Sequence, residues 1–149
     1  MKKISVAWRR LPVNPDSLKN ILLLLMRLVL AYGFFAPAKM KWSDIGSIAD
    51  WFGSMGIPAP TLSAYLAAGT EAAGVLMLAL GLGTRIISIP LIITMGVAIK
   101  TVHWANGFEA GENGFEIPLY YIIMLLTLLV FGPGQWSLDS IIRRKYRTV

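Results

Sequence analysis

The sequence predicts an all-α fold, a bundle of four transmembrane helices with a short interfacial helix in the first outer loop. Hydrophobic residues make up 56% of the 149 residues and charged residues 15%, whereas soluble domains have about 45–50% and about 25%. The apolar residues gather into four blocks, each near the ~17–25 residues that a helix needs to cross a bilayer. None of the blocks carries the polar stripe that each helix of a soluble bundle shows, so we favour membrane helices over buried soluble ones.

The four blocks and the basic tails form a single predicted membrane domain over residues 1–149. The first block resembles a signal peptide, but Arg27 lies within its apolar region and Pro37 within the apparent cleavage site. We therefore expect this block to be retained as a helix. The expected helices lie at about residues 20–36, 62–83, 86–104 and 117–132.

The two connections on the outer side differ in character. In residues 37–61 we expect a short interfacial helix that Ser43 caps and that Gly56 and Pro58 end. Its apolar residues recur at helical spacing and its tryptophans suit the headgroup region: Trp42, Ile45, Ile48, Ala49, Trp51, Phe52 and Met55. The other connection, residues 103–116, contains the tetrapeptide NGFE twice and predicts two tight turns.

The placement of lysine and arginine predicts that both termini are cytoplasmic. On the side opposite the termini the only basic residues are Lys39 and Lys41. Two further basic residues, Arg27 and Lys100, fall within the spans. We therefore interpret the net charge of +6 as an orientation signal, and we expect contact with the lipid bilayer and none with nucleic acid. The basic residues on the side of the termini are Lys2, Lys3, Arg9, Arg10, Lys19, Arg85, Arg143, Arg144, Lys145 and Arg147.

Two charged residues lie in the middle of predicted spans, Arg27 in the first and Glu71 in the second. A charge at mid-bilayer costs at least ~2.5–3.5 kcal/mol, so it usually faces the protein interior and finds a partner. The face of Glu71 carries small residues, which let another helix approach closely. We expect Arg27 and Glu71 to pair, either as a buried ion pair that fixes helix register or as part of a ligand-binding cavity.

Four polar residues from the last two predicted helices form a candidate outer pocket: Lys100, His103, Glu116 and Tyr120. Lys100 and His103 lie one turn apart on one helix, and Glu116 and Tyr120 lie one turn apart on the next. If these helices are neighbours, the two pairs converge just below the outer surface. An interfacial belt of polar side chains is the alternative interpretation.

Motifs that carry known chemistry are absent from the sequence. Without cysteine, the chain forms no disulfide, thiolate metal site or redox thiol. His103 with Glu109, Glu112 and Glu116 is only a weak metal-ligand pattern, so we expect no metal site. There is no P-loop, GxGxxG, GxSxG or HExxH motif, so no catalytic residue is assigned and no cofactor is evident.

With these residues in view, the chain resembles the DoxX family of small four-helix bacterial membrane proteins. The resemblance rests on the segments LLLLMRLVLAYGFFAPAKMKW and GIPAPTLSAYLAAGTEAAGVLMLALGLGTR, which contain the central Arg27, the central Glu71 and a Gly-Thr-Arg turn. The loop NGFEAGENGFEIPLYY is most similar to the HvfX branch. That resemblance implies a link to the maturation of copper-binding peptides of the bufferin type, and other relatives imply a link to membrane oxidoreductase complexes.

Three functional hypotheses follow. The first is a non-catalytic accessory protein of a copper-binding-peptide or oxidative-stress pathway, which binds a modified peptide or its maturation enzymes. The second is a quinone-interacting subunit of an oxidoreductase complex, with Arg27, Glu71, Lys100, His103 and Tyr120 as ligands; only here would the chain take part in an enzyme. The third is a small-solute transporter or ion conductor. It has little support, because four spans without a broken-helix repeat would have to form a homo-oligomer for this function.

Overall fold

The computed structural model describes residues 15–146, which are almost entirely helical and contain no strand, as predicted for an all-α chain. The helices are α1 (Pro15–Ser43), α2 (Ile45–Ser54), α3 (Pro60–Leu80), α4 (Thr84–Ala98), α5 (Glu116–Phe131) and α6 (Leu138–Tyr146). A π-helical turn, Ile99–His103, and a 3-10 turn, Trp104–Asn106, extend α4, and a second 3-10 turn spans Ala110–Glu112. Five of the basic residues on which the predicted orientation rests lie outside the described part of the chain: Lys2, Lys3, Arg9, Arg10 and Arg147.

Three helices are long and apolar enough to cross a membrane: α1 with 29 residues, α3 with 21, and α4 with its extension to Asn106, 23 residues in all. The fourth apolar block forms α5, which has 16 residues and is therefore about 24 Å long. The four predicted apolar helices are thus present; three of them have the length and composition of a membrane span, and α5 is shorter.

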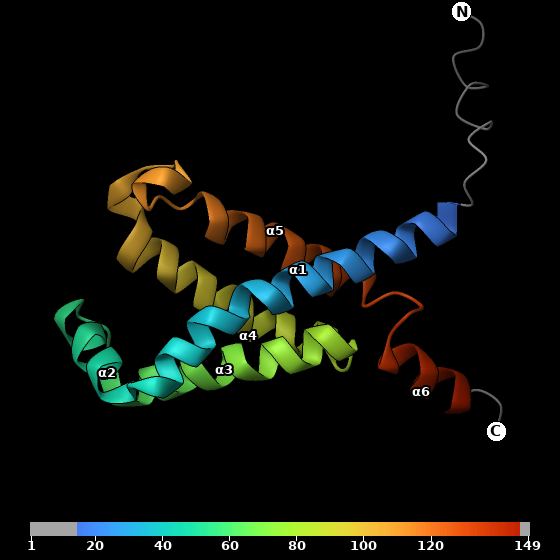
Figure 1. Ribbon diagram of the computed structural model, residues 1–149, viewed down its shortest axis with the longest axis horizontal. Coiled ribbons are helices and arrows are strands. Elements are labelled where there is room, and N and C mark those ends of the chain that lie inside the picture. Colours follow the sequence, from blue (N-terminus) through green and yellow to red (C-terminus); the bar gives the residue numbers. More distant parts are fainter. Residues whose placement is uncertain (1–14, 147–149) are drawn as a thin grey trace, which may run out of the picture.

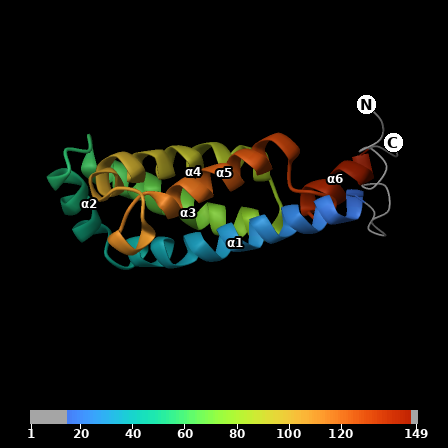
Figure 2. The same ribbon diagram turned by 90° about the horizontal axis from the view of Figure 1, so that it is seen from above.

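The long helices pack side by side, with α2 at one end of the bundle and α6 at the other (Figure 1). The start of α1 lies at the same end as α6, and Figure 2 shows the same arrangement from above. We call this the terminal end, and the opposite end, which holds α2 and the loop between α4 and α5, the loop end.

A core of leucine, isoleucine and phenylalanine side chains from α1, α3, α4 and α5 fills the centre of the bundle. Leu30, Leu78, Leu91, Leu125 and Leu128 are completely buried. Many other large apolar side chains point outwards and are exposed, which is costly in water and favourable in lipid. The outward-facing apolar surface therefore supports a bilayer as the environment of this bundle.

The short helix predicted in the first connection is present as α2. Asp44 caps it, and not Ser43 as expected: the carboxylate accepts a 3.1 Å hydrogen bond from the backbone N–H of Ser47 and another from its hydroxyl. These two hydrogen bonds hold the pKa of Asp44 below its ordinary value. Ser43 itself remains in α1 and donates to the carbonyl of Met40. Phe52 and Ala49 then pack against Ala64 and fasten α2 to α3.

Candidate functional site

Glu71 is buried between α1 and α3, and its partner is Lys41. The Lys41 ammonium nitrogen lies 2.9 Å and 3.0 Å from the two carboxylate oxygens. The side chain of Glu71 is 2% exposed and that of Lys41 is 11% exposed. One residue further along α1, the Trp42 indole N–H donates to the carbonyl of Ala68 at 3.1 Å. Adjacent residues of α1 therefore fix its register against α3.

Arg27 is completely buried at the junction of α1, the end of α3 and the segment before α6. Its guanidinium donates to the carbonyls of Leu78, at 3.3 Å, and Trp136. The carbonyls in the last turn of a helix carry partial negative charge, so the C-terminus of α3 stabilises a cation there. The carboxylate of Asp139 adds a further favourable electrostatic interaction.

The predicted pairing of Arg27 with Glu71 is therefore wrong, although both residues are buried as expected. Helices α1 and α3 are antiparallel, with Lys41 beside Glu71 and Arg27 beside Leu78. Lys41 and Arg27 are 14 positions apart on α1, which corresponds to about 21 Å. The expected helix, residues 20–36, ended before Lys41, and that early boundary hid the real partner.

The turn that joins α3 to α4 is held by Arg27 and Asp139 together. Gly81 has a φ of +68°, and a side chain there would come within 2.0 Å of the Arg27 guanidinium. The Asp139 carboxylate accepts hydrogen bonds from the backbone N–H groups of Gly83, at 2.8 Å, and Thr84, at 3.3 Å. A residue of α6 thus caps α4, an arrangement that sequence patterns gave no means to predict.

The loop between α4 and α5 folds back on itself. The backbone N–H groups of Phe115 and Glu116 donate to the carbonyls of Gly107 and Phe108, both at 3.0 Å. The rings of Trp104 and Phe115 are stacked with centroids 5.5 Å apart. Two tight turns were predicted here, and two other bonds close them: the backbone N–H of Gly107 donates to the carbonyl of Trp104 at 3.4 Å, and that of Asn113 to the carbonyl of Ala110 at 3.1 Å.

Three of the four outer-pocket candidates brace this loop. A ring nitrogen of His103 lies 2.8 Å from the carbonyl oxygen of Asn113. The Glu116 carboxylate accepts from the backbone N–H of Ala110 at 3.0 Å and from the Tyr120 hydroxyl at 2.8 Å. Lys100 is exposed and forms no hydrogen bond with another residue of the described part. The structure therefore shows two separate sets of hydrogen bonds, one at His103 and one at Glu116. No hydrogen bond joins all four candidate side chains into one cluster.

A π-helical turn changes the geometry that was assumed for Lys100 and His103. Both residues belong to this turn, Ile99–His103, and the regular α-helical spacing on which their shared face was predicted does not apply there. Among residues 15–146, no three His, Cys, Asp or Glu side chains are grouped in a way that could hold a metal ion.

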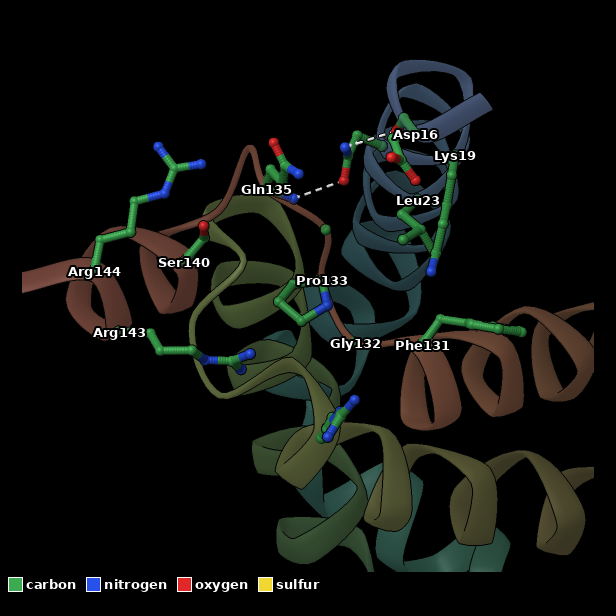
Figure 3. Close-up of a pocket in the computed structure, with 13 residues that line it drawn as sticks. Asp16, Lys19, Leu23, Phe131, Gly132, Pro133, Gln135, Ser140, Arg143 and Arg144 are labelled. Carbon is green, nitrogen blue, oxygen red and sulfur yellow. Dashed lines mark hydrogen bonds between the residues drawn. The ribbon is translucent and has the colours of Figure 1, made fainter. Parts of the chain in front are cut away.

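A polar pocket of about 400 Å³ lies at the terminal end, where it was not predicted (Figure 3). Its cationic lining comes from α1, α4 and α6: Lys19, Arg85, Arg143 and Arg144. Asp16 is the acidic residue of the lining, and residues 132–135 form part of the wall. The sequence signal for this pocket was the cluster of basic residues on one side, which was interpreted as an orientation signal in contact with lipid and not as a pocket.

Comparison with known proteins places this architecture in a family. Residues 22–104, which include Arg27, Lys41 and Glu71, match the family model DoxX. The chain belongs to the DoxX family. No solved structure matches it.

Relatives of this DoxX protein cover most of its length. An uncharacterized protein of Haemophilus influenzae is 31% identical over 138 residues, 87% of this chain and 88% of the relative. A Bacillus subtilis protein named "Putative oxidoreductase CatD" is 33% identical over 121 residues, 80% and 85% of the two chains. The inner membrane protein YphA of Escherichia coli is 28% identical over 126 residues, 81% and 90% of the two chains. Together with the apolar helices, these matches establish a membrane protein in contact with the lipid bilayer.

Proposed function

We propose that this DoxX protein is a non-catalytic accessory protein of the bacterial inner membrane. In this proposal it serves a copper-binding-peptide maturation or oxidative-stress pathway, and its loop end binds a peptide or redox partner. All four apolar blocks cross the bilayer, so both termini lie on one side, and the excess of lysine and arginine there assigns that side to the cytoplasm. The start of α1 and the whole of α6 at one end of the bundle support an even number of spans.

The observation that carries the proposal is the folded loop between α4 and α5. His103 and Glu116 tie it to the helices on either side, as described above. Trp104 and Phe108 are 67% and 47% exposed on it, and Glu109 and Glu112 lie close to them in the chain. Exposed aromatic side chains on a preordered backbone are typical of protein-recognition surfaces, because little conformational entropy is lost on binding.

The buried charges support an accessory role. Lys41 and Glu71 satisfy each other, and Arg27 donates to the carbonyls of Leu78, in the last turn of α3, and Trp136, so these groups stabilise the bundle. A catalytic acid or base would instead need to reach a substrate atom. Both buried clusters are therefore assigned to packing and register in this proposal.

A complementation experiment tests the proposed loop function. Deletion of the gene is expected to alter peptide modification, peptide export or copper tolerance, and the wild-type gene is expected to restore it. Trp104→Ala with Phe108→Ala should not restore the phenotype although the protein accumulates in the membrane. Tyr32→Ala is the matched control, because Tyr32 is an aromatic residue 85% exposed on α1. Full restoration by the double variant, or no phenotype on deletion, contradicts the proposal.

A second candidate function is a quinone-interacting subunit of an oxidoreductase complex. The observation that favours it is the name of the Bacillus subtilis relative, "Putative oxidoreductase CatD". The sequence suggested five ligands, which are spread along the bundle: Arg27 towards the terminal end, Glu71 in the middle of α3, and Lys100, His103 and Tyr120 at the loop end. Solvent extraction of the purified protein distinguishes the candidates: stoichiometric quinone favours the second, and its absence together with a loop-dependent phenotype favours the first.

A further inference from the structure

We propose that the terminal end of the bundle contains a binding site for one anionic phospholipid. The headgroup phosphate would lie in the polar pocket lined by Lys19, Arg85 and Arg143, and an acyl chain would lie in the groove beside it. This inference does not depend on the proposed function of the loop end.

The positive charge of the pocket comes from separate elements that the fold brings together. Lys19 belongs to α1, Arg85 to α4, and Arg143 and Arg144 to α6. Asp16 is the one carboxylate in the lining, so cations outnumber it. Figure 3 shows Arg143 extending towards the segment that contains Pro133, whereas Arg144 extends away from it. The pocket therefore has a net positive potential that suits an anion.

Contacts within the chain hold two of these cations in place without neutralising them. Arg85 donates to the carbonyl of Val130 at 3.0 Å, which uses one of the five N–H donors of its guanidinium. The Lys19 ammonium lies 5.0 Å from the centre of the Phe131 ring, a cation–π contact that leaves its charge intact. Arg143 forms no hydrogen bond with another described residue. Donors from all three side chains remain available to phosphate oxygens.

The wall of the pocket is built by a segment with little side-chain bulk, Gly132-Pro133-Gly134. Gly132 and Gly134 have φ values of +78° and +83°, a conformation that favours glycine. The segment is fixed to α1 because the backbone N–H of Gln135 donates to the side-chain oxygen of Asn20 at 2.9 Å. A defined backbone wall thus closes one side of the cationic pocket.

An apolar groove of about 380 Å³ adjoins the pocket between α1 and α5 and shares Lys19, Leu23 and Phe131 with it. Its further lining comes from Leu18, Leu22, Met26 and Thr127. From Leu18 to Met26 the groove follows α1 for about 12 Å away from the terminal end, towards the centre of the bundle. A polar pocket that continues into an apolar groove along the helix axis matches a phospholipid headgroup with its acyl chain.

The neighbouring residues place the pocket at the headgroup level of the membrane. Trp136 follows the pocket wall directly and is 58% exposed, and tryptophan is enriched at membrane interfaces. Helix α6 carries exposed Ile141 and Ile142 beside its basic residues, the pattern of a helix that lies in the interface. Basic pockets between transmembrane helices bind anionic headgroups, so an anionic phospholipid is the occupant that fits this pocket.

Native mass spectrometry of the full-length protein in mild detergent tests the site. Short-chain phosphatidylglycerol is expected to bind at least about tenfold more tightly than phosphatidylethanolamine of the same chain length, and equimolar inorganic phosphate should not displace it. Arg143→Gln should weaken phosphatidylglycerol binding about fivefold, and Arg143→Gln with Arg85→Gln about 25-fold. Lys100→Gln, which removes a cation at the loop end, should leave binding within about twofold of wild type.

A second pair of variants tests the groove without any change of charge. Leu22→Trp should fill it and weaken phosphatidylglycerol binding, whereas Leu66→Trp, at an exposed position of α3, should not. Equal affinity for the two phospholipids, displacement by phosphate alone, equal effects of Arg143→Gln and Lys100→Gln, or stoichiometric quinone in the groove would each overturn the proposal. If the arginine double variant does not accumulate, the result for Arg143→Gln decides, because that side chain has no hydrogen bond to lose within residues 15–146.

Discussion

The Lys41 ammonium contacts both carboxylate oxygens of Glu71, at 2.9 Å and 3.0 Å, inside the interface of α1 and α3. The contact joins the loop end of α1 to the middle of α3. A buried charge in an apolar environment is strongly unfavourable unless its partner is present, so the two residues depend on each other. Together with the Trp42–Ala68 hydrogen bond, the pair sets which faces of the two helices meet.

We expect Lys41→Met and Glu71→Gln to be coupled. Each single change removes one partner of a buried pair, and loss of Lys41 should cost about 3–5 kcal/mol. Glu71→Gln should cost less because the glutamine oxygen still accepts from Lys41. The double variant should lose less stability than the sum of the single losses. Thermal unfolding in detergent measures this, with Lys39→Met, at an exposed position of α1, as the control. Additive losses would contradict the coupling.

We expect Gly81→Ala to destabilise the bundle far more than Gly56→Ala. Both glycines have a similar φ, +68° and +72°, so an alanine at either site carries a strain of about 1–2 kcal/mol. At Gly56 no other atom lies within 4 Å of the added carbon, whereas at Gly81 it meets the Arg27 guanidinium and Ser137. The difference in thermal stability between the variants therefore reports the close approach of Arg27. Equal losses would mean that this approach does not matter.

The sequence predicted the existence of helices α1 to α5 better than the contacts between them. The apolar blocks, the short helix α2 and the burial of Arg27 and Glu71 followed from hydropathy and charge alone. The partner of Glu71 did not, because membrane helices are apolar on nearly all faces and give no periodic signal for register. The basic pocket also escaped prediction: it requires α6, read only as a basic tail, and a turn at Gly132-Pro133-Gly134 that returns the chain to α1.

We expect Asp139→Ala to destabilise the turn between α3 and α4. The Asp139 carboxylate accepts from two backbone N–H groups at the start of α4, and loss of a helix cap costs about 0.5–2 kcal/mol. Amide hydrogen exchange at Gly83 and Thr84 should accelerate. Asp50→Ala, at an exposed position of α2, should leave exchange at these amides unchanged. Unchanged exchange in Asp139→Ala would show that the cap contributes nothing.

We expect the loop end to face the periplasm and the terminal end the cytoplasm. The chain has no cysteine, so a single introduced thiol reports its own side of the membrane. In intact right-side-out vesicles, Ser54→Cys on α2 should react with an impermeant thiol reagent, whereas Tyr146→Cys at the end of α6 should react only after permeabilisation. Both residues are exposed. Labelling of both in intact vesicles would mean that α5 does not complete the fourth span, and the reverse pattern would invert the topology.

We expect His103→Ala and Glu116→Gln to loosen the loop between α4 and α5, and Lys100→Ala to leave it unchanged. His103 holds the carbonyl of Asn113, and Glu116 holds the N–H of Ala110 and the hydroxyl of Tyr120, whereas Lys100 has no such partner among the described residues. Each lost hydrogen bond contributes about 0.5–1.5 kcal/mol, or about 1.5–3 kcal/mol where a charged group takes part. Limited proteolysis at residues 104–115 should therefore become faster in the first two variants and not in the third. From the proposed function we also expect His103→Ala and Glu116→Gln to complement the gene deletion less well than Lys100→Ala, although all three variants accumulate normally in the membrane. Faster proteolysis together with full complementation would separate the bracing of the loop from its proposed function. The hydrogen bonds would then keep the loop rigid without being needed for partner recognition.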